Sequence, residues 1–335
     1  MKFENKKWVV RVALAGALCL GVATVAKADD STVVAAPVWN VLAQESLVQH
    51  FATGAVVGGV NANGTGTNLN AGLENVRLGG TFKAGSDDTL TVTAQLAAQY
   101  ATGFTLLNAY DVHSLNNFNN GLSLKIGQFK VAFGQDGNAN PDELIRANYS
   151  IIDAVLPGNV ANEGNPWLVG AELDQTYSDL TIQVAAVQSQ VYAATNGTKF
   201  DYVGRAQWKS GNLALGLSDY LQSTNPVLTL NNLGANGSLS LDVVKLDLEA
   251  IFGGAGRNGY TGTLSAKLSD LTPAVWYDFG TTSAGNNLVN DDLGAGLNWQ
   301  VNAAHRIALD VDFTGPNNGD ILSVNTETLQ FQQIF

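Results

Sequence analysis

The chain has 335 residues, with 17 basic and 29 acidic side chains, a net charge of −12 at pH 7 and one cysteine. This acidic balance repels phosphate backbones and excludes nucleic acid as an expected partner. A single cysteine excludes a disulfide framework within the chain.

Residues 1–28 are predicted to be a secretory signal peptide. Lys6, Lys7 and Arg11 precede an apolar run over 12–26, and Ala26 and Ala28 fit the small-residue pattern of a cleavage site before Asp29. Cleavage would remove Cys19 and leave 12 basic and 28 acidic residues, a net charge of −16. We therefore expect an exported protein without thiols.

Residues 29–47 form an N-terminal segment with two open interpretations. Val38 to Val48 could be a short periplasmic segment or part of a first strand. The rest of the chain, residues 48–335, is treated as one domain.

Alternation with period two dominates from residue 75 onward. Over 75–83, Val76, Leu78 and Phe82 share one face of a predicted strand, while Arg77 and Lys83 share the other. The same pattern recurs at 90–100, 121–129, 167–175, 180–188, 200–209, 212–220, 243–252, 260–268, 271–279, 292–301, 305–314 and 328–335. The connections are rich in turn-forming residues and contain no helix, which indicates antiparallel neighbours.

The two faces of these predicted strands differ in charge. The polar face holds eight basic and ten acidic residues: Arg77, Lys83, Asp111, Lys125, Glu172, Asp174, Asp201, Arg205, Lys209, Lys245, Asp247, Glu249, Lys267, Asp278, Asp292, Arg306, Asp310 and Asp312. The other face is almost uncharged and carries aromatic residues near the strand ends. This partition fits a wall between lipid and water, whereas a soluble sandwich buries its apolar face against a second sheet.

The length and hydropathy of the segments favour a transmembrane barrel. After the signal, no run of 18 apolar residues appears, and a membrane protein without helices must be a closed barrel. At roughly 10 residues per strand, the mature chain accommodates about 14 to 16 strands, a width that leaves an aqueous lumen.

The C-terminal residues alternate up to a terminal phenylalanine. Leu329, Phe331 and Phe335 resemble the signal that barrel-assembly machinery reads in outer-membrane proteins. We therefore expect that machinery, outer-membrane lipid and lipopolysaccharide as partners.

Three segments resemble the phosphate-selective porin family of bacterial outer membranes. They are Val76-Arg77-Leu78-Gly79, the stretch Leu107 to Val112, and the stretch Leu124 to Gly134 with its Gly-Gln-Phe-Lys-x-x-Phe-Gly core. The resemblance covers about a third of the mature chain. It implies a 16-stranded, usually trimeric barrel with one loop folded into the pore.

Residues 134–166 are the candidate for that constriction loop, because they break the alternation and form the longest connection. Asn140 fits a helix cap and Pro141 a first helical position, which predicts a short helix. The predicted pore-lining and constriction residues are Arg77, Asp111, Lys125, Lys130, Asp136, Asp142, Glu143, Arg146, Arg205 and Lys209.

The sequence departs from the family in its charge. Phosphate-selective members line the throat with many basic residues, but the mature chain has only 12. Since rings of charge set ion preference in wide pores, we expect weak selectivity with a lean toward cations.

The function that these observations favour is a porin for passive diffusion of small hydrophilic solutes and ions. The alternative is a secreted or surface all-β protein with a structural or adhesive role. No catalytic residue, cofactor or metal is expected: the G-x-G-x-x-G at 254–259 is followed by strand rhythm, and the three histidines lack metal-ligand spacing.

Overall fold

The computed structural model describes residues 38–51, 67–84, 87–97, 103–116, 120–135, 145–146, 167–189, 200–223, 229–253, 258–283, 287–314 and 323–334. The predicted signal peptide, the terminal Phe335 and most of the 134–166 segment lie outside these residues. Within the described ranges, no helix is long and apolar enough to cross a bilayer.

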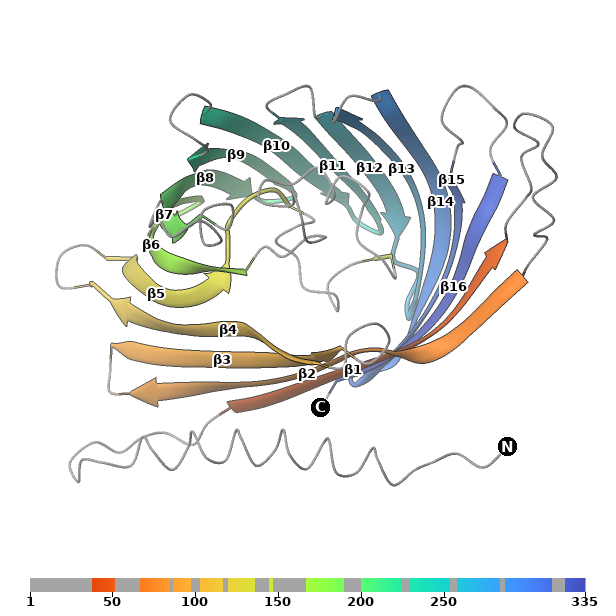
Figure 1. The fold of residues 1–335 in the computed structure, drawn as a ribbon, viewed down its shortest axis with the longest axis horizontal. Helices are drawn as coiled ribbons and strands as arrows, with labels where there is room; N and C mark the ends of the chain where they lie inside the picture. The colour runs from red at the N-terminus through yellow and green to blue at the C-terminus, as the bar shows by residue number, and fades with distance from the viewer. Residues whose placement is uncertain are drawn as a thin grey trace.

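Sixteen strands form in the described residues and close into one ring (Figure 1). They are β1 (Val38–Phe51), β2 (Thr67–Ala84), β3 (Asp88–Ala97), β4 (Gly103–Ser114), β5 (Leu122–Lys130), β6 (Trp167–Tyr177), β7 (Leu180–Gln188), β8 (Phe200–Ser210), β9 (Leu213–Ser223), β10 (Thr229–Leu241), β11 (Val244–Gly253), β12 (Asn258–Ala266), β13 (Leu271–Ser283), β14 (Asn287–Asn302), β15 (His305–Thr314) and β16 (Ser323–Ile334). Each strand is antiparallel to its neighbours, and pairing of β1 with β16 closes the barrel. The predicted all-β barrel is confirmed, with the favoured strand number.

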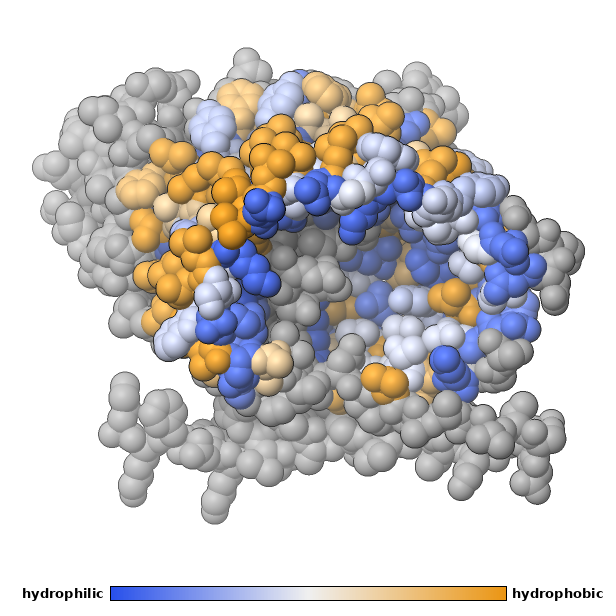
Figure 2. All heavy atoms as spheres, turned by 180° about the vertical axis from the view of Figure 1, so that it is seen from behind, coloured by the Kyte–Doolittle hydropathy of each residue, from blue (hydrophilic) through white to orange (hydrophobic). Residues whose placement is uncertain are grey.

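The barrel is apolar outside and polar inside. Leu217, Val184 and Leu264 are 59%, 55% and 47% exposed on outward positions, while Asp278 and Asp310 on inward positions are 0% and 1% exposed. Figure 2 shows orange, hydrophobic side chains on the outer surface and blue, hydrophilic ones around the hollow. This inverted arrangement follows from alternation in a closed sheet between lipid and water.

Tight turns join the strands at one end of the barrel. Ser178, Gly211, Asp242 and Ser269 have positive φ angles of 47°, 55°, 46° and 59° and sit in the turns after β6, β8, β10 and β12. The connections at the other end include the longest one, residues 131–166 between β5 and β6. In outer-membrane barrels, short turns lie on the periplasmic side and long loops on the extracellular side.

Three strands lie outside the segments predicted from alternation: β1, β4 and β10. From Val38 onward, the segment with two interpretations belongs to β1. In β10, the outward positions include Ala235 and Gly237 between Leu233 and Leu239, so the apolar signal of that face is weak.

A β-bulge in β4 reverses the faces that alternation assigns there. Leu106 pairs with Ala94 and Asn108 pairs with Thr93, so Leu107 is an extra residue without a partner position. The extra residue exchanges the two faces beyond the bulge, so Asp111 points to the face opposite to the one predicted for it.

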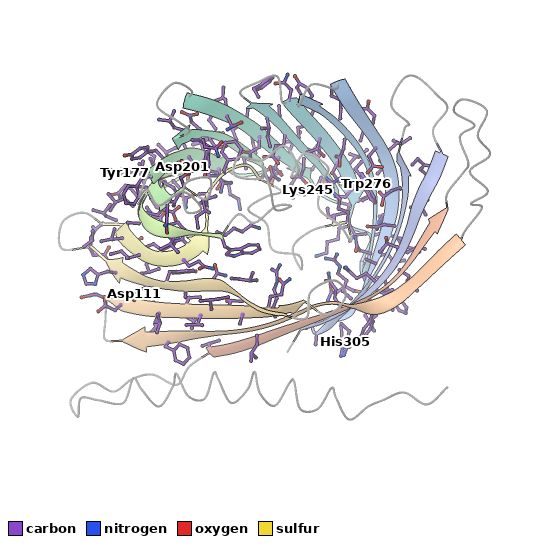
Figure 3. The ribbon with its side chains drawn as sticks, viewed as in Figure 1. Asp111, Tyr177, Asp201, Lys245, Trp276 and His305 are labelled. Atoms are coloured by element: carbon purple, nitrogen blue, oxygen red, sulfur yellow. The ribbon has the colours of Figure 1, made fainter. Side chains whose placement is uncertain are left out.

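The bulge places Asp111 on the face of β4 opposite to the predicted one. Asp111 pairs with Leu90 on β3 and with Ile126 on β5, and Ile126 is 55% exposed on the outer surface. The prediction that Asp111 lines the lumen is therefore wrong, and it lies on the outer face of β4 (Figure 3). The neighbouring Tyr110 points inward and packs edge-on against Phe129, with ring centroids 6.4 Å apart.

Two facing glycines let β5 and β6 bend away from the barrel wall at the ends that lie away from their tight turns. Gly127 pairs directly with Gly170. Gly127 has φ +134°, and a Cβ there would collide with the carbonyl oxygen of Ala109, while one on Gly170 would collide with that of Ala186. At Gly127 only glycine tolerates both the positive φ and the close approach, and at Gly170 only glycine tolerates the close approach.

Past Gln128 on β5 and before Gly170 on β6, the two strands pair only with each other. The β4–β5 pairing stops at Ala109 with Gln128, and the β6–β7 pairing starts at Gly170 with Val187. Residues 128–130 and 167–169 thus form a two-stranded extension, which we call the β5–β6 tip.

Candidate functional site

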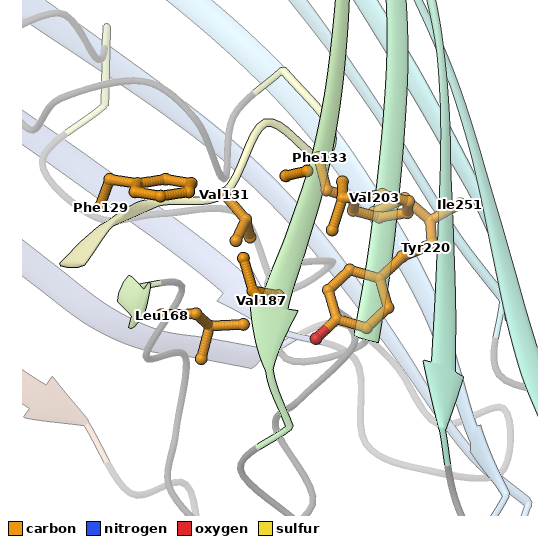
Figure 4. Close-up of a cluster of buried hydrophobic side chains, with 9 residues drawn as sticks. Phe129, Val131, Phe133, Leu168, Val187, Val203, Tyr220 and Ile251 are labelled. Atoms are coloured by element: carbon orange, nitrogen blue, oxygen red, sulfur yellow. The ribbon is translucent and has the colours of Figure 1, made fainter. Parts of the chain in front are cut away.

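The β5–β6 tip packs one of its faces against the inner surface of the barrel. Phe129 and Leu168 join a buried apolar cluster with Val131, Phe133, Ala185, Val187, Val203, Tyr220 and Ile251 (Figure 4). Val187, Val203 and Ile251 occupy inward positions of β7, β8 and β11, where charged and polar residues dominate elsewhere. These inward positions are apolar because the chain that follows β5 covers them and excludes water from them.

Residues 134 and 135 continue this attachment through hydrogen bonds. The Gly134 N–H donates to Ser218 Oγ at 3.2 Å, and the Gln135 N–H donates to Glu249 Oε1 at 2.6 Å. Gln135 Nε2 also donates to Asp247 Oδ1 at 3.0 Å. Gly134 has φ +72°, and a Cβ on it would lie 2.6 Å from Glu249 Oε1, so this path along β9 and β11 requires glycine.

Arg146 forms a second attachment further along the wall. Its Nη1 donates to Asp278 Oδ2 at 2.7 Å, its Nη2 donates to Thr261 Oγ1 at 3.1 Å, and its guanidinium lies 5.7 Å from the Trp276 ring centre. Asp278 faces Asp292 directly across β13 and β14. Like charges in that position repel, and the guanidinium offsets the repulsion.

The backbone next to Arg146 is also held. Asn298 on β14 donates its side-chain N–H to the Ile145 carbonyl oxygen. The described parts of the 134–166 segment thus contact the inward faces of β9, β11, β12, β13 and β14.

Trp276 fits beside Arg146 because two glycines lie next to it. A Cβ on Gly294, its cross-strand partner, would collide with the indole, and one on Gly296 would lie 3.0 Å from it. The indole Nε1 donates to Asp312 Oδ1 at 3.2 Å. In Figure 3, Trp276 on β13 lies on the right of the ring and Asp201 on β8 lies on the left, on the opposite side of the barrel. A tryptophan facing Gly-x-Gly across a hairpin is a sequence signal for this site that alternation alone does not provide.

Lys125 lies at the base of the tip in an ion pair. Its Nζ contacts a Glu172 carboxylate oxygen and lies 3.6 Å from Asp174 Oδ2, and it stands 5.2 Å from the Phe129 ring centre. Arg205 is 8% exposed and lies on the inner face of β8, opposite Gln183 of β7 and Ser218 of β9. Both predicted lumen residues therefore face inward.

Arg77 and Lys130 meet at the other face of the tip. The Arg77 guanidinium and Lys130 Nζ each lie 5.6 Å from the Trp167 ring centre. Arg77 Nε donates to Gln95 Oε1 at 2.9 Å. Trp167 was not among the predicted site residues, because its place depends on the bend of the tip.

The other predicted residues are distributed as follows. Lys209 is exposed near the turn at 211–212. Leu329 and Phe331 are outward on β16, 43% and 37% exposed. The predicted Asp136, Asp142 and Glu143, the helix expected from Asn140 and the terminal Phe335 lie outside the described residues. Among those residues, no group of three or more His, Cys, Asp or Glu is arranged to hold a metal ion.

The geometry defines a class of fold: a closed antiparallel membrane barrel with an apolar exterior, a charged interior and a connection attached inside it. No family model matches the chain, and no curated protein matches it.

Solved structures match nearly the whole length of the chain. An anion-selective porin from Comamonas acidovorans is similar with a TM-score of 0.65 at 11% identity, over 90% of this chain and 99% of that one. OprB from Pseudomonas putida has a TM-score of 0.69 at 11% identity, over 89% and 94%. OmpF from Salmonella typhi, solved with daunomycin, has a TM-score of 0.65 at 10% identity, over 89% and 97%. The fold is therefore that of outer-membrane porins.

Proposed function

We propose that this protein is a bacterial outer-membrane porin, a water-filled channel for passive diffusion of small hydrophilic solutes and ions. The observation that carries the proposal is the division of the barrel into an apolar outer surface and a charged inner one. A sheet with water on its inside and lipid on its outside produces that division, whereas a soluble adhesin does not need it.

Reconstitution into planar bilayers tests this function. We expect discrete conductance steps from purified protein, and faster migration of unheated than of boiled samples on SDS gels. The alternative, a surface all-β protein with a structural or adhesive role, predicts a detergent-independent soluble protein without conductance.

The 134–166 segment is the proposed constriction loop. Its described parts are held against the inner wall by Gln135 and Arg146. A connection attached there narrows the lumen, and the throat would include the predicted Asp136, Asp142 and Glu143.

Selectivity is proposed to be weak with a lean toward cations. Lys125 and Arg146 lie in ion pairs, which limits their attraction for passing anions. Asp292, Asp310 and Asp312 gather on the inner face of β14 and β15, beside the Asp278 that pairs with Arg146.

Export and assembly complete the proposal. Residues 1–28 would direct export, and the alternating C-terminus would be read by the barrel-assembly machinery in a membrane of lipid and lipopolysaccharide. Outward Leu329 and Phe331 are consistent with this. Amino-terminal sequencing of the protein from outer membranes, with Asp29 as the expected first residue, tests the cleavage site.

We also propose that the protein assembles as a homotrimer.

A further inference from the structure

Four carboxylates of the described residues point into the lumen from β13, β14 and β15, and they differ in how far water reaches them. Asp278, Asp310 and Asp292 are 0%, 1% and 7% exposed. Asp312 is partly exposed. An ion that passes this wall therefore meets the carboxylate of Asp312 more directly than the other three.

Asp312 is held by a neutral group. Trp276 Nε1 donates a hydrogen bond to Asp312 Oδ1 at 3.2 Å. An indole nitrogen only donates and carries no charge, so this bond orients the carboxylate and leaves its negative charge in place. No lysine or arginine within the described ranges forms an ion pair with Asp312, whereas Arg146 pairs with Asp278.

The indole reaches Asp312 by crossing a strand. Trp276 on β13 pairs with Gly294 on β14, and Gly294 pairs with Asp312 on β15. A Cβ on Gly294 would collide with the indole nitrogen, so a larger residue there would displace the donor. The Trp276 side chain is 2% exposed, and its packing therefore fixes the place of the hydrogen bond.

The same indole also contacts a cation. The Arg146 guanidinium lies 5.7 Å from the Trp276 ring centre and donates to Asp278 Oδ2 at 2.7 Å. Trp276 thus contacts a guanidinium with its ring and a carboxylate with its nitrogen. Loss of the nitrogen would release Asp312, and an ion pair between Asp312 and Arg146 would offset the negative charge.

From this geometry we propose that Asp312 determines the preference of the β13–β15 wall for cations, and that Trp276 is its positioning residue. The indole keeps the carboxylate in the lumen and apart from Arg146. The inference rests on the proposed function, because an ion preference needs a channel. The solutes concerned are small cations, namely alkali metal ions and solutes with a primary ammonium group, which an exposed carboxylate in a pore attracts.

Reversal potentials in a potassium chloride gradient test the role of Asp312. Asp312→Asn should move the potential toward chloride. Asp310→Asn removes the same charge from a buried position on the same face of β15 and should move it clearly less. Asp219→Asn is the control outside the lumen, since Asp219 pairs with Leu233, which is 49% exposed on the outer face. Equal shifts from the two β15 variants, or no shift from Asp312→Asn, would overturn the assignment.

Trp276→Phe tests the positioning role, because phenylalanine keeps an aromatic ring and lacks the donor. We expect a shift toward chloride in the wild-type background and no further shift in the Asp312→Asn background. A merely structural role of the ring would give the same shift in both backgrounds. That result, or an unchanged potential in the wild-type background, would remove Trp276 from the proposal.

Cysteine variants measure the exposure of the two β15 positions directly, since Cys19 lies in the predicted signal and the mature chain has no other cysteine. Asp312→Cys should react with a water-soluble, negatively charged methanethiosulfonate, and the reaction should move the potential back toward cations. A positively charged reagent should move it toward chloride. Asp310→Cys should react more slowly with both. Equal rates at the two positions, or a potential that does not change after reaction at position 312, would contradict the proposal.

The same recordings separate this inference from the proposed function. Heat-modifiable migration on SDS gels first shows that each variant is folded. Channel steps with the wild-type potential in every variant at position 312 remove the role of Asp312 and leave the porin. Absence of steps from the wild-type protein removes the porin itself.

Discussion

Arg146 is the residue on which the attachment of the loop to the β12–β14 wall depends most. Asp278 is fully buried and faces Asp292, so the guanidinium is what makes two adjacent carboxylates tolerable there. Breaking a buried ion pair by removing one partner costs more than the pair contributes, because the other charge is left behind.

Arg146→Ala should therefore weaken the attachment by roughly 3 kcal/mol. We expect a larger and noisier open-channel current, since the released segment no longer narrows the lumen steadily. The double variant Arg146→Ala with Asp278→Asn removes the carboxylate that would be left unpaired. It should restore part of the smaller, low-noise current of the wild type. Single-channel recording gives both values, and an unchanged trace for Arg146→Ala would show that the loop is held elsewhere.

Gly127 offers a test of the bend that starts the β5–β6 tip. Gly127→Ala should destabilise the folded barrel by at least about 1 kcal/mol, because alanine resists positive φ and its Cβ meets the Ala109 carbonyl. Gly204→Ala is the matched control, since nothing lies within 4 Å of a Cβ there. Urea midpoints of the two variants in detergent should differ clearly, and equal midpoints would argue against a required glycine.

At the scale of the element, alternation predicts most strands because each wall strand separates lipid from water along its whole length. It fails where one face carries small residues, as in β10. It also assigns the wrong face in β4, because Leu107 looks like any other apolar strand residue and nothing in its sequence neighbourhood marks the bulge. Lys125 and Arg205 are placed inward correctly, since their strands are regular.

The pairings within the lumen could not be predicted in the same way. Arg146 and Asp278 are 132 positions apart, and Gln135 and Glu249 are 114 apart. Which of them meet depends on the path of the connection after β5, and that path starts at the facing glycines. A pattern of period two carries information about faces but none about such a path.

Phe133 should be the main apolar contact of the segment that enters the lumen. It is 3% exposed and meets Tyr220 edge-on, with ring centroids 6.1 Å apart. Phe133→Ala should cost roughly 3 kcal/mol of local packing and make this segment sensitive to protease added from the extracellular side. Phe252→Ala, at a position 43% exposed on the outer face, is the control and should leave protease resistance unchanged. Equal resistance of both variants would mean that the polar contacts alone hold the segment.

At the scale of the whole molecule, the charges of the lumen are unevenly distributed, with Arg146 and Arg306 lying among the carboxylates of β13, β14 and β15. Arg77 and Lys130 lie beside Trp167, on the side of β2 and the tip, whereas the carboxylates gather on β13, β14 and β15. A solute that crosses such a lumen meets both signs, and the net preference depends on the difference between them.

Removing carboxylates from the acidic wall should shift that preference. Asp310→Asn with Asp312→Asn should move the reversal potential in a salt gradient toward chloride, and the shift should shrink at high ionic strength as the charges are screened. Lys245→Gln, at a position 44% exposed beside a turn, is the control for a charge away from the wall and should move the potential little. A wild-type channel with strong chloride or phosphate preference would contradict the lean toward cations. A double variant with an unchanged potential would place the selective charges in the constriction loop and not on the strands.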